Sequence, residues 1–118
     1  MIFSGINLKR GAVMEKYAWK ARLVEGKLEE YKRRHREIWP EMVEVLTEAG
    51  IRNYSIWIVG DEIFGYYECE KDADFAASVQ KNSPVVDRWN EYMKEVMVME
   101  MDPVTGAQPK MEQVWNFR

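Results

Sequence analysis

His35 is the only histidine in this sequence and the side chain best suited to carrying protons near neutral pH. Tyr31 comes four residues before it and Trp39 comes four residues after it. Side chains four positions apart are neighbours on a helix, so these three are expected to form one row. Two aromatic neighbours would wall a small polar ligand, but a histidine on an apolar helix face can also be an ordinary core residue. From these residues alone, both interpretations stay open.

Other kinds of catalytic chemistry find no support in the residue pattern. One histidine with scattered carboxylates has no metal-ligand spacing, and Cys69, the single cysteine, has no partner for a metal site and is expected to pack in the core. The chain contains no Gly-x-Ser-x-Gly motif, no phosphate-binding loop and no dinucleotide fingerprint. We therefore expect no metal, no cofactor and no covalent nucleophile.

Composition limits the classes of partner. A chain of 118 residues forms one domain, and its net charge of -3 argues against a nucleic-acid surface. The basic run from Lys32 to Arg36 is flanked by glutamates and is expected to be the solvated side of a helix. A single cysteine suits a reducing compartment, and we find neither a membrane-length apolar run nor a secretory h-region. These features predict a cytoplasmic protein.

Hydrophobic periodicity predicts an alternation of strands and helices. Side chains alternate from Tyr17 to Leu23 as in a strand, and Pro40 is expected to kink or restart a long helix near Trp39. The expected strands are residues 15–24, 51–59, 63–69 and 111–117, and the expected helices are residues 27–49, 72–79 and 84–97. With the adjacent helices 72–79 and 84–97 counted as one helical segment, the order is strand, helix, strand, strand, helix, strand. This order predicts an α+β, ferredoxin-like fold (βαββαβ) with helices on one face of an antiparallel sheet.

Both faces of the expected second strand carry apolar side chains. Alternation puts Tyr54, Ile56 and Ile58 on one face and Ile51, Trp57 and Val59 on the other. Helices can cover only one face of the sheet, so the second face should meet another sheet. We therefore predict a homodimer in which two sheets face each other, with a pocket between each sheet and its helices.

Four segments carry a resemblance to a known family. The stretch EYKRRHREIWPE (residues 30–41) resembles the signature EYxRRHxxIWPE of the L-rhamnose mutarotase family. GIRNYSI (residues 50–56), DRWNEYM (residues 87–93) and MEQVW (residues 111–115) resemble the family's (G)xxNYxI, xRWWxYM and LxEVFxL segments. The similarity runs over residues 14–118, a single mutarotase-like domain, and leaves residues 1–13 as an N-terminal extension.

The resemblance implies a dimeric α/β-barrel enzyme that interconverts the α and β anomers of L-rhamnose with no metal or organic cofactor. It also implies that His35 is the proton donor and that Tyr31, Tyr54 and Trp89 contact the sugar. Asn90 stands where the family has a second tryptophan, which leaves the identity of the sugar open.

Trp39 is a further candidate for stacking on the sugar. Two alternatives are a mutarotase for another 6-deoxyhexose such as L-fucose, and a non-catalytic ligand-binding dimer with the same fold. The fold is shared by oxygenases, dehydratases and haem proteins and does not decide among functions.

Overall fold

The computed structural model describes residues 14–101, 103–104 and 108–118. The extension expected at residues 1–13 lies outside them. The strands are β1 (Glu15–Leu23), β2 (Ile51–Val59), β3 (Glu62–Cys69) and β4 (Met97–Val98). The helices are α2 (Leu28–Arg36), α3 (Pro40–Glu48), α4 (Ala73–Lys81) and α5 (Pro84–Met93). No helix in these ranges is long and apolar enough to cross a membrane.

Local chemistry explains where the helices begin and end. Proline lacks an N–H, which the first turn of a helix does not need, so Pro40 and Pro84 begin α3 and α5. The Asp72 side chain accepts a hydrogen bond from the backbone N–H of Phe75 and caps α4. Gly50 follows α3 with φ of +76°, a left-handed conformation that glycine adopts without strain. The predicted restart of the long helix at Pro40 is confirmed.

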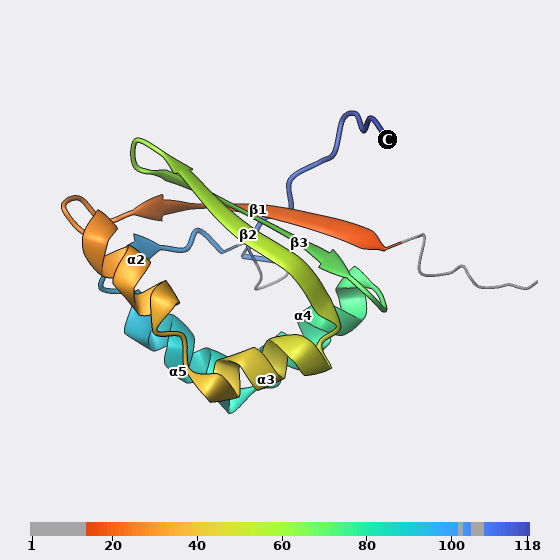
Figure 1. The fold of residues 1–118 in the computed structure, drawn as a ribbon, viewed down its shortest axis with the longest axis horizontal. Helices are drawn as coiled ribbons and strands as arrows, with labels where there is room; N and C mark the ends of the chain where they lie inside the picture. The colour runs from red at the N-terminus through yellow and green to blue at the C-terminus, as the bar shows by residue number, and fades with distance from the viewer. Residues whose placement is uncertain (1–13, 102, 105–107) are drawn as a thin grey trace, which may run out of the picture.

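The strands form one antiparallel sheet in the order β2-β3-β1-β4. This is the strand order of a ferredoxin-like fold, so the predicted α+β class is confirmed. In Figure 1 the sheet arches along one side of the molecule and the helices form an arc along the other. Apolar side chains from the inner face of the sheet, among them Ala21, Ile63 and Cys69, pack into a core that α3 and α5 close. The inner face of the sheet and the helices therefore enclose the region that the site occupies.

The prediction of a final strand at residues 111–117 is wrong. After α5, which ends at Met93 rather than Met97, the chain turns back and Met97 pairs with Leu23 at the edge of β1. The fully buried Val96 fixes this return. Lys110 makes one isolated bridge to Trp19, and residues 111–118 are exposed and belong to no strand.

Two further expectations from the sequence are corrected. Strict alternation put Ile51 on the face of Trp57, but Ile51 is buried in the core. The register of β2 shifts between Arg52 and Ser55. Because of this irregularity, Ile51 lies on the opposite face of the sheet from Trp57. The basic run is also not wholly solvated, because Arg34 is buried between α2 and α5.

Candidate active site

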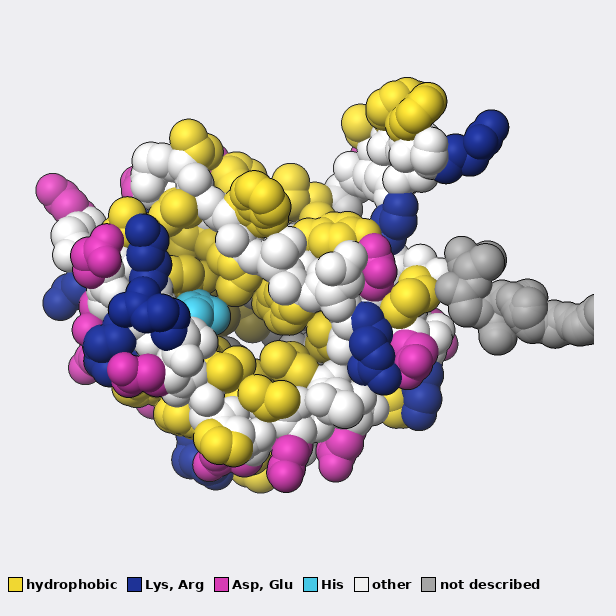
Figure 2. All heavy atoms as spheres, viewed as in Figure 1, with side chains coloured by type: hydrophobic (Ala, Val, Ile, Leu, Met, Phe, Trp, Pro, Cys, Tyr) yellow, Lys and Arg dark blue, Asp and Glu magenta, His cyan; other side chains and the backbone are white. Residues whose placement is uncertain are grey.

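A cavity of about 590 Å³ lies between the inner face of the sheet and the helices. Figure 2 shows it as a hollow lined mainly by apolar side chains, with the histidine at its wall. Tyr31, His35, Tyr54, Trp89 and Asn90, all predicted from the sequence to act at the site, line this one cavity. The volume is within the range of small-molecule pockets.

His35 lies on the last turn of α2 with one ring nitrogen engaged by its own helix. Its Nδ1 is 3.1 Å from the backbone carbonyl oxygen of Tyr31. A carbonyl oxygen can only accept, so Nδ1 carries the proton, and in the neutral imidazole Nε2 is left as an acceptor. Burial lowers the pKa of His35 below its ordinary value, and the hydrogen bond to Tyr31 opposes part of this effect. The arrangement holds a neutral base at the wall of the cavity near pH 7.

Tyr31 presents a hydroxyl group that has no partner among the described residues. The side chain is buried, and its Oη makes no hydrogen bond within the described part of the chain. Burial raises the pKa of Tyr31, which keeps the hydroxyl protonated. Its ring lies 4.5 Å from the His35 ring, centroid to centroid. An unpaired buried hydroxyl is costly, so this group is poised to bind a polar ligand.

Tyr54 reaches the cavity from β2 because of the irregularity in that strand. Asn53 adopts φ of +53°, a conformation that asparagine tolerates better than most residues, and the following side chain turns to the inner face. Trp19 donates its indole Nε1–H to the Tyr54 hydroxyl at 3.1 Å. Tyr54 is 38% exposed and lines the cavity, so its hydroxyl proton, which is retained at neutral pH, is available for donation to a ligand.

Trp19 lies flat across β3 because its partner there is a glycine. Gly65 pairs with Trp19 in the sheet, and a Cβ at Gly65 would collide with the indole ring. The absence of a side chain therefore creates space for the indole that orients Tyr54. The alternation from Tyr17 to Leu23 predicts that Trp19 belongs to a strand, but it does not assign Trp19 to the site. A large aromatic paired with a glycine across a sheet is the signal that could have revealed it, but the pairing is not visible in the sequence.

Trp89 and Trp39 form an aromatic cluster, and only Trp89 lines the cavity. The Trp89 ring meets the His35 ring edge-on with centroids 5.8 Å apart. Trp39 lies behind it, with its ring at 5.1 Å from Trp89 and 5.3 Å from Tyr92. The helix break before Pro40 removes Trp39 from the row of Tyr31 and His35, although Trp39 is four residues beyond His35.

Ionisable groups in the cavity wall are few. Lys32 and Arg36 line it, and among the described lining residues there is no aspartate or glutamate. No cluster of histidine, cysteine and carboxylate side chains suited to a metal ion occurs in the described ranges. The lining side chains that can exchange a proton are therefore His35, Lys32 and the tyrosines Tyr31 and Tyr54.

Comparisons with known proteins agree with the motifs. Residues 16–117 match the model of the L-rhamnose mutarotase family. The chain is 38% identical to the L-rhamnose mutarotase of Jannaschia sp. (strain CCS1) over 96 residues, which span 81% of this chain and 92% of that protein. The chain belongs to the L-rhamnose mutarotase family. It is also 39% identical to the family member of Burkholderia ambifaria (strain MC40-6) over 100 residues, again 81% of this chain and 92% of the relative.

Solved structures extend the comparison to the fold. The crystal structure of an L-rhamnose mutarotase from Formosa agariphila superposes with a TM-score of 0.71 at 25% identity, covering 88% of this chain and 99% of that one. Tetracenomycin F2 cyclase from Streptomyces glaucescens gives a TM-score of 0.61 at 14% identity, covering 88% and 99%. The likeness to the cyclase, at 14% identity, concerns the fold alone.

Proposed function

We propose that this chain catalyses the interconversion of the α and β anomers of L-rhamnose, as an isomerase of rhamnose utilisation. The observation that carries the proposal is the state of His35. Its Nδ1 is bonded to the Tyr31 carbonyl, while its Nε2 has no hydrogen-bond partner among the described residues, at the wall of an aromatic cavity. Membership of the L-rhamnose mutarotase family supplies the reaction that this arrangement serves.

Mutarotation needs only proton transfers. A base takes the proton from the anomeric hydroxyl, the bond between C1 and the ring oxygen breaks, and the ring oxygen takes up a proton. The resulting aldehyde rotates and closes on its other face. Since no hydride moves and no carbon–carbon bond breaks, the reaction requires no metal or organic cofactor. A placed acid/base group contributes about 100- to 10,000-fold to such a step.

We assign His35 as the group that moves the proton. The anomeric and ring oxygens are bonded to the same carbon, so one imidazole nitrogen can reach both in turn. Nε2 takes the proton from the anomeric hydroxyl, and the imidazolium then delivers it to the ring oxygen. Tyr31 and Tyr54, whose hydroxyls are protonated at neutral pH, donate hydrogen bonds to the oxygen on which negative charge develops.

The remaining site residues bind the sugar. The Trp89 indole offers an apolar surface to the C–H face and the methyl group of the ring. The Asn90 amide lines the same cavity and has no hydrogen-bond partner among the described residues, so it can bind a sugar hydroxyl. Trp39 supports Trp89 from behind rather than stacking on the sugar directly.

We also propose that two copies associate through the outer faces of their sheets to form a dimeric α/β-barrel. Trp57 and Val59 on that face are each 68% exposed. Val114, Trp115 and Phe117 in the C-terminal segment, which runs away from the helices in Figure 1, are 88%, 75% and 80% exposed. Apolar side chains gathered in this way are typical of an interface, and a second sheet would cover them.

We propose a cytoplasmic location, supported by Cys69, a buried free thiol. The sugar is less tightly specified than the reaction, because Asn90 stands where the family motif that this segment resembles has a second tryptophan. L-fucose, another 6-deoxyhexose, is therefore the second candidate substrate.

Anomer exchange measured by NMR saturation transfer tests the proposal. Wild-type protein should transfer saturation between the anomers of L-rhamnose well above the buffer rate, and L-fucose in a parallel sample ranks the two sugars. Exchange of both sugars at the buffer rate would contradict the proposal and favour a non-catalytic binding protein.

A further inference from the structure

Arg34 is buried although it carries a permanent charge. It is only 8% exposed and is the one buried charged side chain among the described residues. Burying a charge is costly unless the charge is paired and hydrogen-bonded. Arg34 meets this requirement fully: Nε donates to Glu30 at 2.6 Å and Nη2 donates to Glu95 at 2.7 Å.

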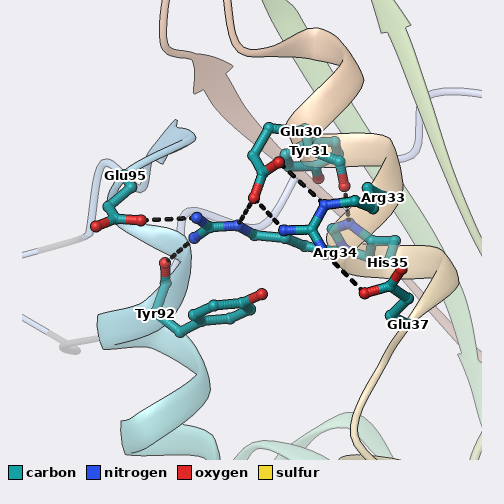
Figure 3. A network of polar contacts seen from close by, with 8 residues as sticks. All are labelled: Glu30, Tyr31, Arg33, Arg34, His35, Glu37, Tyr92 and Glu95. Carbon is teal, nitrogen blue, oxygen red and sulfur yellow. Dashed lines mark hydrogen bonds and ion pairs between the residues drawn. The ribbon is translucent and has the colours of Figure 1, made fainter.

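The remaining contacts of Arg34 fasten α2 to the end of α5. Nη1 donates to the backbone carbonyl of Tyr92 at 2.6 Å. The guanidinium carbon lies 4.2 Å from the centroid of the Tyr92 ring, within the range of a cation–π contact. Figure 3 shows the side chain reaching from α2 between Glu30 on one side and, on the other, Tyr92 of α5 and Glu95, which follows that helix. The planar guanidinium group thus contacts Glu30 on its own helix and both the backbone and the ring of Tyr92 on α5.

The Tyr92 ring connects this contact to Trp89 and His35 in the proposed active site. It lies 5.7 Å from the Trp89 ring, which in turn lies 5.8 Å from the His35 ring. His35 follows Arg34 directly in α2. Arg34, Tyr92, Trp89 and His35 therefore close a ring of contacts, and the separation of α2 from α5 at Arg34 sets the separation of His35 from Trp89.

We propose that Arg34 is a positioning residue for the mutarotase reaction, which fixes the imidazole of His35 against the indole of Trp89 by clamping α2 to α5. The proposal rests on the function proposed above. Lysine cannot reproduce these contacts, because it lacks the planar guanidinium group that donates to a carbonyl and two carboxylates at once. A displacement of about 1 Å at a reacting group can lower the rate about 100-fold.

The neighbouring Arg33 provides a matched control. It also pairs with Glu30 and donates to Glu37, but its side chain is 42% exposed and faces solvent. Arg34→Met and Arg33→Met remove the same charge from adjacent positions, and only the first breaks the contact with α5. Arg34→Lys keeps the positive charge at this position but lacks the planar guanidinium group.

The test combines kinetics with the proton NMR signal of His35, which is unambiguous because the chain has one histidine. The C2–H signal senses the ring currents of Trp89 and Tyr31, so it reports their placement in the folded protein whatever the overall stability. We expect Arg34→Met to shift this signal well beyond the effect of Arg33→Met and to lower kcat about 10- to 100-fold with a smaller change in KM. For Arg34→Lys, both the position of the His35 signal and kcat should lie between the values of wild type and of Arg34→Met.

An unmoved His35 signal in folded Arg34→Met overturns the proposal, and so does a moved signal with kcat within twofold of the wild-type value. If Arg34→Met does not fold, Tyr92→Leu, which removes the ring from the clamp, must shift the signal in the same way or the proposal fails. If wild-type protein does not accelerate anomer exchange, the proposed function fails, while the NMR comparison still decides whether Arg34 sets the placement of His35.

Discussion

The Trp19 indole and the Tyr54 hydroxyl are joined by a hydrogen bond of 3.1 Å, in which the indole N–H is the donor. The bond connects β1 to β2 across the inner face of β3, since β3 lies between them in the sheet. It is possible only because Gly65 leaves room for the indole. Gly65 thus helps to determine the position of the Tyr54 hydroxyl, which we propose binds the substrate.

Gly65→Ala should displace the Trp19 indole and destabilise the fold by about 1–3 kcal/mol, the usual cost of overpacking a core. Urea denaturation measures this change. Trp19→Leu alone also loses stability, but in a Trp19→Leu background the added methyl group should cost much less, because its collision partner is gone. Additive effects in this double-mutant cycle would show that the indole is not what excludes a side chain at Gly65.

The imidazole of His35 should titrate below its ordinary pKa of 6.5, because burial disfavours its charged form. The unfolded chain then binds more protons than the folded one between the two pKa values, so folding stability rises with pH in that window. This contribution is complete above about 6.5 and is lost as the pH falls towards the lower, folded pKa. A pH titration of the histidine NMR signal and urea denaturation of wild type and His35→Gln measure both effects. A midpoint at or above 6.5 would contradict the assignment of a buried neutral imidazole.

Much of the fold follows from local patterns in the sequence. Alternation from Tyr17 to Leu23 predicted the strand β1, and the helix expected to restart near Pro40 and the helix expected from residue 84 both begin where the structure has them. The last strand was misplaced because Met97 and Val98 form only two residues of pairing, too few to leave a periodic pattern. Residues 111–117, which include Val114, Trp115 and Phe117, were expected to form a strand, but they form none in this chain.

Local patterns in the sequence also predicted part of the site, whereas residues whose roles depend on contacts between distant segments were missed. Helical spacing placed Tyr31 beside His35, as the structure confirms. Trp19 was missed because its role depends on the pairing of β1 with β3, a contact between residues far apart in the chain. Arg34 was read as solvated because its neighbours are charged, and its burial depends on α5.

Val59→Glu should weaken self-association by placing a charge in the proposed sheet-to-sheet interface. Sedimentation velocity at micromolar concentration should give wild type about twice the chain mass of 14.0 kDa and the variant a value shifted towards one chain. Val43→Glu, the same change at an exposed position of α3, is the control and should leave the mass unchanged. A wild-type protein that sediments as a single chain would exclude the dimer.

Asn90→Ala should raise KM for the preferred sugar about two- to tenfold, the worth of one neutral hydrogen bond, with little change in kcat. Rates of anomer exchange at increasing sugar concentration separate the two constants. Gln80→Ala, also in the cavity wall but with its amide already bonded to the Ala76 carbonyl, is a control for general effects of losing an amide. Equal KM for Asn90→Ala and wild type with both L-rhamnose and L-fucose would remove Asn90 from the binding site.

Anomer exchange of L-rhamnose with wild type and His35→Asn tests the central claim most directly. Asparagine can keep a hydrogen bond to the Tyr31 carbonyl but cannot take up a proton, so the fold is retained while the base is lost. By saturation transfer at neutral pH, wild type should exchange the anomers well above the buffer rate, and His35→Asn should be slower by about 100- to 10,000-fold in its catalysed rate. Equal catalysed rates for the two folded proteins would show that His35 does not carry the proton and would contradict the mechanism.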